Sequence, residues 1–432
     1  MRNAILRAAQ TSILLAFISV IAFAADVPQS GDAVFDRVIT LVNSEFHDEN
    51  ALDRFNAAAK KEIESAAPAL STTGSTARVD AAIETALASL QASHNGRFKS
   101  DTIAYFELSD IFRFAIRDDL RRLFPPDGEV NYAGIGMVTQ LIGDARFVTD
   151  VYDGSPAAKA GIVMGDEILA VDGKPYREIA SFQGKVGQSV DVRLRRKADA
   201  ALTSIKVAVE RLRPLPTFEK AIKDSVAVSE RDGRKIGYVR FWTLSTRDGL
   251  DIAARELSTG RLSNVDGLVV DLRGRWGGGA ADAAELFVGD TPSFRLIPRR
   301  GKDTLANVRW RGPVVALVDE GTRSGLELFA YALKINGIPL VGERTAGALL
   351  AGRAYTLPDN SLLEIAVSDA VIDDNVRLEG NGIAPDIRVA LPLAYAAGRD
   401  PQREAAVSEM LRLLADGTSD RIVTPRQPSL TR

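Results

Sequence analysis

Apolar residues recur with two different spacings along the chain, and the spacing changes near residue 130. From residue 25 to about 125, runs such as VFDRVITLVNSEF and AAIETALASLQASH place apolar side chains three and four positions apart, which predicts an N-terminal helical region. Between residues 130 and 213, short runs such as MVTQLIG, RFVTDVY and SVDVRLRR alternate with turns rich in glycine and aspartate, which predicts a β-rich domain. Pro125, Pro126 and Gly128 mark a linker between the two.

A third pattern begins at about residue 217, where apolar strands alternate with helical segments. IGYVRFW, DGLVVDLR, PVVALVDE and IPLVGE are short apolar runs, and helical spacing lies between them around 247–257, 280–288 and 324–335. This alternation predicts an α/β domain over residues 217–400 with a mostly parallel sheet. The segment YTLPDNSLLEI predicts a hairpin, and residues 401–432 predict an amphipathic C-terminal helix and a tail.

The first 24 residues have the pattern of an export signal. Two arginines precede the apolar run TSILLAFISVIAFA, which is too short to span a membrane comfortably, and Ala22-Phe23-Ala24 fits the cleavage pattern. We interpret residues 1–24 as a signal peptide, with an uncleaved membrane anchor as the alternative. The mature protein is therefore expected to be periplasmic or secreted, with no integral membrane span.

Composition narrows the chemistry further. The 432 residues suggest two or three domains, and a net charge of −3 does not indicate nucleic acid as a partner. The absence of cysteine excludes disulfides, a thiol nucleophile and thiolate zinc sites. No metal or other cofactor is predicted. Because the chain has only two histidines, His47 and His94, a histidine base has only two candidates.

Three segments of the β-rich domain, NYAGIG, SPAAKAGI and GDEILAVDG, resemble a PDZ domain of the kind found in bacterial proteases. The resemblance implies that the loop at Gly134, Ile135 and Gly136 binds the C-terminal carboxylate of a polypeptide through converging N–H groups. The alternative is that this loop is only a tight turn before a strand.

Ser324 lies in EGTRSGLELFAYALK, between an apolar strand and a helical segment. A serine there is either a helix N-cap or a nucleophile that needs a base. A second segment, DGLVVDLRGRWGGGA, ends in glycines at 277–279 but has neither the P-loop ending nor the spacing of a dinucleotide site. These glycines are candidates to expose an N–H to an oxyanion.

The order of these motifs, followed by LVGERTAGA and LEGNGIAPDI, resembles the C-terminal processing and tricorn-like serine peptidases. The resemblance runs from about residue 80 to about residue 390 and implies a ClpP/crotonase-like α/β core. In that family the nucleophile lies three residues before a glutamate. The resemblance therefore matches Glu327 to this glutamate and puts Ser324 at the nucleophile position. The lysine that the processing peptidases use as their base is replaced by Ala348.

The tricorn-like branch uses a histidine that follows a serine, with a glutamate near the end of the domain. Ser93-His94 in LQASHNGRF and Glu379 in RLEGNGIAPD match that pattern. The resemblance therefore implies His94 as general base with an unperturbed pKa of about 6.5. Ser93 and Glu379 would orient it, and the N–H groups of Gly325 and Gly277 would form the oxyanion hole.

Several plainer interpretations compete with this assignment. His94 is alternatively a turn histidine beside Asn95-Gly96, and Glu379 an ordinary loop carboxylate. His47 is interpreted as a surface or structural residue, and Lys302 or Lys334 would act as the base only by an accident of the fold. Asp271 and Arg273 are expected to form an internal salt bridge.

The leading hypothesis is a periplasmic serine endopeptidase that cleaves extended or C-terminally recognised polypeptides through an acyl-enzyme. The alternative is a catalytically inactive peptide- or ligand-binding protein on the same scaffold. The substrate and the oligomeric state stay open.

Overall fold

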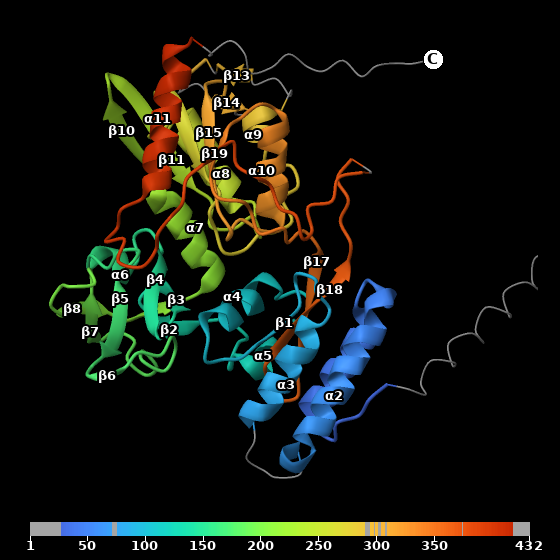
Figure 1. Cartoon of the computed structure of the whole chain (residues 1–432). Helices are drawn as coiled ribbons and strands as arrows, with labels where there is room; N and C mark the ends of the chain where they lie inside the picture. Colours follow the sequence, from blue (N-terminus) through green and yellow to red (C-terminus); the bar gives the residue numbers. More distant parts are fainter. Residues whose placement is uncertain are drawn as a thin grey trace, which may run out of the picture. The chain divides into compact units, whose positions relative to one another are not determined.

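The computed structural model describes residues 27–70, 76–289, 294–297, 299–300, 304–306, 309–373 and 375–417 (Figure 1). The predicted signal peptide and the end of the predicted tail lie outside these residues. The chain divides into two compact units, one formed by residues 1–91 with 357–359 and the other by residues 92–356 with 360–432. Each unit is described separately below.

The N-terminal unit is helical. It contains α1 (Ala33–Glu45), a short 3-10 turn η1 (Glu49–Ala51), α2 (Leu52–Leu70) and α3 (Thr76–Ala88). Asp32 caps α1, because its side chain accepts hydrogen bonds from the N–H groups of Val34 and Phe35. The buried residues Phe35, Val38 and Val42 lie on one face of α1, which confirms the helical spacing seen in the sequence.

The second unit begins earlier than the proline-rich linker at 125–128. Strand β1 (Gly96–Phe98) and helices α4 (Ile103–Ile111) and α5 (Leu120–Leu123) belong to this unit. Helix α4 buries Ile103, Tyr105 and Phe106 in a cluster that also contains side chains of residues 130–212. The sequence region predicted as one helical block of residues 25–125 is thus divided at residue 91, and it contains a strand because β1 pairs with a partner more than 260 residues away.

The β-rich domain has its own core. An antiparallel sheet has the order β3-β4-β5-β7-β8, and β2 pairs with β9 beside it. Residues such as Ile135, Val148, Val192 and Val207 fill the interior of this domain. The bounds of its elements are β2 Tyr132–Gly134, β3 Met137–Ile142, β4 Ala145–Val151, α6 Pro156–Lys159, β5 Glu167–Val171, β6 Lys174–Pro175, β7 Ser189–Arg195, β8 Thr203–Ala208 and β9 Glu210–Leu212.

The α/β domain is built on a sheet of order β10-β11-β12-β15-β16-β19, parallel except for the edge strand β10. This confirms the parallel sheet predicted from alternating strands and helices. Its strands are β10 Ala227–Arg231, β11 Arg234–Arg240, β12 Gly267–Asp271, β15 Val314–Val318, β16 Leu340–Gly342 and β19 Ile387–Arg388.

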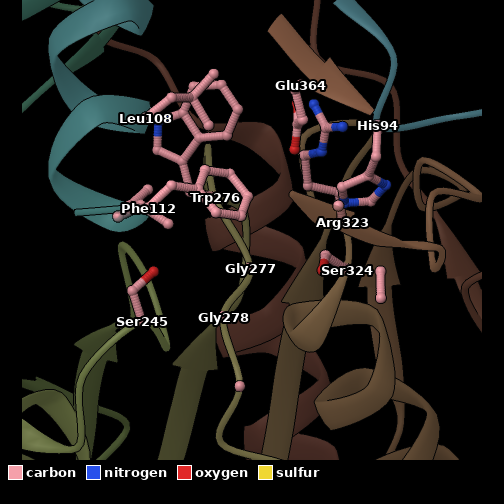
Figure 2. A pocket seen from close by; sticks show the side chains of 14 residues that line it. His94, Leu108, Phe112, Ser245, Trp276, Gly277, Gly278, Arg323, Ser324 and Glu364 are labelled. Atoms are coloured by element: carbon pink, nitrogen blue, oxygen red, sulfur yellow. The ribbon is translucent and has the colours of Figure 1, made fainter. Parts of the chain in front are cut away.

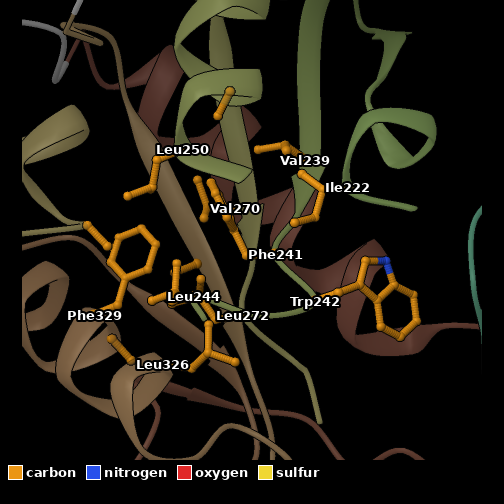
Figure 3. Close-up of a cluster of buried hydrophobic side chains, with 14 of the residues drawn as sticks. Ile222, Val239, Phe241, Trp242, Leu244, Leu250, Val270, Leu272, Leu326 and Phe329 are labelled. Carbon is orange, nitrogen blue, oxygen red and sulfur yellow. The ribbon is translucent and has the colours of Figure 1, made fainter. Parts of the chain in front are cut away.

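Helices cover both faces of this sheet. On one face, Leu268, Val270 and Leu272 pack against α7 (Pro214–Ser225), α8 (Asp248–Ser258) and α10 (Gly325–Ile335) (Figure 3). On the other face, Val269 and its neighbours pack against α11 (Pro401–Ala415), the predicted C-terminal helix. Successive strand residues point to opposite faces, so both faces of β12 are apolar. The carboxyl ends of β12 and β15 carry the loops that form the site described next.

The remaining described elements lie around this core. β17 (Ala351–Thr356) and β18 (Leu362–Ser368) form the predicted hairpin, and β1 pairs with β18. Helix α9 (Glu285–Val288) and the small hairpin β13 (Phe294–Leu296) and β14 (Thr304–Ala306) follow the glycine loop. Within the described ranges, no helix combines the length and the apolar character that crossing a bilayer requires.

Candidate active site

Ser324 occupies a strained turn between β15 and α10. Its backbone has φ of +55° and ψ of −128°, which is unfavourable for a residue with a side chain and costs on the order of 1–3 kcal/mol. Although Ser324 stands at the N-cap position, its side chain makes no capping hydrogen bond. The hydroxyl is therefore not used to begin the helix, which was the plainer interpretation of this residue.

Glu327 connects the turn at Ser324 to the segment around Ala348, the position at which the resemblance to the processing peptidases predicts a lysine. The Glu327 carboxylate is fully buried and accepts hydrogen bonds from Thr345 Oγ1 at 2.5 Å, Gly347 N at 2.8 Å and Ala348 N at 2.6 Å. The N–H of Ser324 in turn donates to the carbonyl of Ala348 at 2.8 Å. The residue that replaces the lysine thus lies directly beside Ser324.

The glycine loop after β12 packs tightly on the same turn. A Cβ added to Gly277 would lie 2.5 Å from Gly325 N and from Ser324 Cβ, and one added to Gly325 would lie 2.0 Å from the carbonyl oxygen of Gly278. Only glycine allows this approach at both positions. Among the described residues, the N–H groups of Gly277 and Gly325 have no hydrogen-bond acceptor, so both donors remain available.

Ser93, His94 and Glu379 form a chain of hydrogen bonds that we call the relay. Ser93 Oγ lies 2.9 Å from Glu379 Oε2 and 2.8 Å from His94 Nδ1, and Ser93 N donates to Glu379 Oε1 at 2.7 Å. A carboxylate only accepts hydrogen bonds, so the Ser93 hydroxyl donates to Glu379 and accepts from Nδ1–H of His94. This assignment leaves Nε2 of His94 without a proton, as a general base requires.

The relay is held by the small sheet of β1, β17 and β18. Gly96 of β1, two residues after His94, pairs with Glu364 of β18. The Asn95 side chain accepts a hydrogen bond from Ala366 N at 3.2 Å. On the opposite side, Glu379 also accepts from the N–H groups of Leu349 and Leu350, at 2.9 and 3.3 Å. Backbone contacts therefore fix both ends of the relay.

His94 and Ser324 line one cavity of about 330 Å³. Figure 2 shows His94, Arg323 and Glu364 on one side of this cavity and Trp276 with Leu108 and Phe112 on the other. Gly277 and Gly278 line it as well, so the predicted base, nucleophile and one predicted oxyanion donor share one space. In the part of the chain that the structure describes, no hydrogen bond joins the Ser324 hydroxyl to His94.

The electrostatics of the cavity differ from the sequence expectation. Burial, with a smaller contribution from the positive charge of Arg323, lowers the pKa of His94 to about 3 instead of the unperturbed 6.5. His94 is thus a neutral imidazole over the ordinary pH range. Burial also raises the pKa of Glu364 to about 7, partly opposed by Arg323. A Cβ on Gly352 would lie 2.7 Å from Glu364 Oε1 and 3.1 Å from His94 Cδ2, so Glu364 and His94 flank this glycine.

Sequence reasoning did not assign a role to Trp276, Glu364 or Glu107. Glu107 of α4 is fully buried and accepts hydrogen bonds from Trp276 Nε1 at 2.6 Å and from Arg275 Nη2 at 2.7 Å, as well as from Tyr152 OH. It thereby fixes the wall of the cavity to α4 and to the β-rich domain. An acidic residue inside the apolar pattern of α4 was the available signal for this role.

The other base candidates lie in different surroundings. His47 belongs to the N-terminal unit, where its ring lies 4.8 Å from that of Phe46. Lys334 Nζ is bound to Asp386 Oδ1 and to the carbonyl of Ala384, both at 2.8 Å. Lys302 lies outside the described residues. Neither His47 nor Lys334 lines the cavity around Ser324.

Asp271 and Arg273 form the expected internal salt bridge. Arg273 Nη2 lies 2.7 Å from both Asp271 Oδ2 and Asp400 Oδ2, and Tyr238 OH donates to Asp271 at 2.7 Å. Gln402 accepts from Arg273 Nη1 at 3.0 Å. Arg273 and its neighbours hold the pKa of Asp271 down to about 2 despite its complete burial. We call these five residues the ion cluster.

The loop of residues 134–136, which was predicted to bind the C-terminal carboxylate of a polypeptide, points its carbonyl oxygens into the β-rich domain. The Ile135 carbonyl accepts from Ala157 N at 2.8 Å, and the Gly136 carbonyl accepts from Tyr152 N at 2.9 Å. In a trans peptide the N–H points opposite to the C=O. The N–H groups of Gly136 and Met137 therefore point away from the domain interior, whereas Gly134 lies in β2, paired with Glu210 of β9.

The α/β domain that carries the serine turn and the glycine loop, and the β-rich domain before it, each match a known protein family. Residues 235–389 match peptidase family S41, and residues 147–196 match a PDZ domain. The segment of residues 235–389 is therefore similar to peptidase family S41, and it follows a segment that is similar to a PDZ domain.

Curated relatives agree with this assignment. The chain is 28% identical over 298 residues to a carboxyl-terminal-processing protease of a Picosynechococcus strain, covering 65% of this chain and 70% of that protein. It is 29% identical over 280 residues to putative tricorn protease homolog 2 of Streptomyces coelicolor, covering 60% of this chain and 23% of that protein. The chain spans 54–70% of the length of four carboxyl-terminal processing relatives.

A solved structure also has a similar fold. Mature CPAF superposes with a TM-score of 0.51 at 13% identity, covering 91% of this chain and 99% of that one. At this identity the likeness concerns the fold alone.

Proposed function

We propose that this protein is an active serine endopeptidase that uses Ser324, His94, Ser93 and Glu379 as a catalytic tetrad. The observation that carries the proposal is the direction of the hydrogen bonds in the relay. Because Glu379 orients the Ser93 hydroxyl, His94 presents an unprotonated Nε2. His94 lines the same cavity as Ser324, whose hydroxyl is left unused by helix capping.

The reaction follows from these groups. Ser324 Oγ attacks the scissile carbonyl carbon while its proton passes to Nε2 of His94. The N–H groups of Gly277 and Gly325 donate to the oxyanion that forms. Collapse of the intermediate breaks the C–N bond, and His94 returns the proton to the leaving amine. Water then attacks the acyl-enzyme by the same route and releases the acid.

The substrate side of the proposal rests on the PDZ domain. The outward N–H groups of Gly136 and Met137 are suited to a carboxylate at the end of a chain. We therefore expect polypeptides to be recognised by their C-termini. An amidated C-terminus should weaken binding of a peptide to the isolated full chain, as measured by fluorescence anisotropy; equal affinity would contradict this part of the proposal.

Export is supported by the sequence of residues 1–24. A basic start, an apolar run and the Ala22-Phe23-Ala24 site favour a periplasmic or secreted protein. N-terminal sequencing of the protein recovered from the producing cell tests this, and a mature chain that starts at Met1 would contradict it.

The central experiment is labelling with a fluorophosphonate. The wild-type protein should be labelled stoichiometrically, and peptide mapping should place the label on Ser324 rather than on Ser245, which lines the same cavity. Ser324→Ala should abolish labelling, and Ser408→Ala, an exposed serine of α11, should leave it unchanged. A protein that is folded but never labelled would favour the inactive, ligand-binding alternative.

A further inference from the structure

Among the described residues, Arg323, which directly precedes the proposed nucleophile, forms no salt bridge. It is half-buried and lines the catalytic cavity. Among the described residues no carboxylate lies within 4.0 Å of its guanidinium, and its one ring contact is with Trp276, 5.6 Å from the ring centre. The nearby arginines behave differently, since Arg240 pairs with Asp150 and Arg275 with Glu107, both at 2.7 Å.

The cavity is therefore positively charged under mildly acidic conditions. Of its lining residues, only His94, Arg323 and Glu364 can carry a charge. Burial keeps His94 neutral by lowering its pKa to about 3, and burial raises the pKa of Glu364 to about 7. Below pH 7, Arg323 thus carries the charge of the cavity.

A second cavity shares Arg323 and Trp276 and contains charges of both signs. It has a volume of about 390 Å³, and its charged lining residues besides Arg323 are Asp150, Asp319, Glu320, Glu343, Arg240 and Arg275. A carboxylate in this second cavity would meet four acidic side chains, whereas Glu364 is the one acidic residue among the described residues that line the catalytic cavity with Arg323.

We propose that Arg323 binds a carboxylate of the substrate in the catalytic cavity and so directs cleavage to peptide bonds near an acidic group. A guanidinium with free N–H donors is the protein group best suited to a carboxylate. The carboxylate belongs either to an aspartate or glutamate side chain or to the terminus of the substrate. This inference rests on the proposed function, because it concerns the selectivity of the same site.

The test compares peptides that differ in one carboxylate. Quenched peptides are built around a cleavage site mapped by mass spectrometry in an unfolded protein, with Glu or Gln beside the scissile bond. A second pair has a free or an amidated C-terminus near that bond. At about pH 6, the wild-type protein should cleave one acidic member with a kcat/KM about tenfold above its neutral counterpart. The pair that shows the difference identifies the source of the carboxylate.

Variants assign the preference to Arg323. Arg323→Gln should abolish the ratio while labelling of Ser324 persists, and Arg323→Lys should restore part of it. Arg412→Gln removes an exposed arginine of α11 and should leave the ratio unchanged. If Arg323→Gln keeps the wild-type ratio, or if neither pair shows a ratio, the inference is overturned while the labelled serine still supports the proposed function.

A binding measurement separates the two failures. The same pairs are titrated into Ser324→Ala, with and without Arg323→Gln, so that the ratio of Kd values is obtained without turnover. An acidic preference of about tenfold that requires Arg323 supports the inference even if the wild-type protein is not labelled. Equal Kd values for both members of each pair overturn it.

Discussion

The relay and the ion cluster are two polar groups inside the same unit, and they differ in what is left unsatisfied. In the ion cluster, Asp271 and Arg273 bind each other and three further side chains, and Arg273 does not line the catalytic cavity. In the relay, the described residues make a hydrogen bond to Nδ1 of His94 alone, and His94 lines a cavity. Burial and charge are common to both, so the free acceptor in an open space is the property that indicates catalysis.

The largest effect is expected when the two histidines are removed one at a time. His94→Ala should lower kcat on an unfolded protein substrate by about a millionfold, because loss of the base alone costs nearly as much as loss of the whole catalytic group. His47→Ala should leave kcat unchanged, since His47 packs on Phe46 in the helical unit. The rate of peptide release measures both, and persistent cleavage by His94→Ala would show that the relay is not the base.

The next largest effect is expected on stability, when the ion cluster is broken. Arg273→Met leaves Asp271 buried with an uncompensated charge, which should lower the free energy of unfolding by about 3–5 kcal/mol. Urea unfolding measures the change, and the fraction that remains folded should still be labelled at Ser324. A stable Arg273→Met variant that cannot be labelled would instead give the ion cluster a catalytic role.

The third prediction concerns the far end of the relay. Glu379→Gln removes the charge that orients Ser93, so His94 loses its fixed tautomer and kcat should fall about a hundredfold. Because Glu379 is a positioning residue, KM should change little, and Glu379→Asp should recover part of kcat. If Glu379→Gln and Glu379→Asp instead raise KM by the same factor, Glu379 acts only by holding the backbone of Leu349 and Leu350.

Local patterns in the sequence explain how far prediction reached. The strands β12 and β15 were predicted because both are short and mostly apolar, and α10 because its apolar residues have helical spacing. The contact between Ser93 and Glu379 joins residues 286 positions apart, and only the family resemblance suggested it. No local pattern predicts β1, whose pairing with β18 places His94.

The electrostatic properties of the site were beyond sequence reasoning for a related reason. A pKa depends on the burial and on the neighbouring charges that the fold brings together. Arg323 is next to Ser324 in the chain, but its proximity to His94 and Glu364 arises only when β18 and the segment before β1 meet the turn. The unperturbed pKa expected for His94 was therefore too high.

The smallest effect expected is a pH dependence of selectivity, and it sharpens the contrast between paired and unpaired arginines. Burial raises the pKa of Glu364 to about 7, so its carboxyl is neutral below that pH and becomes a carboxylate above it. The new negative charge offsets Arg323, whose only neighbours with titratable groups in the cavity are His94 and Glu364. The preference for an acidic over a neutral peptide should thus decline as pH rises through about 7, by on the order of 1 kcal/mol, since Arg323 is only half-buried and its charge is partly screened by water.

Glu364→Gln provides the control for this decline, because the amide keeps the size of the side chain and does not titrate. In that variant the ratio of kcat/KM for the acidic and neutral peptides should stay near its low-pH value on the alkaline side. The ratio cancels changes in the general base, since His94 and Ser324 act on both peptides. A ratio that falls equally in the wild-type protein and in Glu364→Gln would mean that another group titrates, and that Arg323 is not balanced by Glu364.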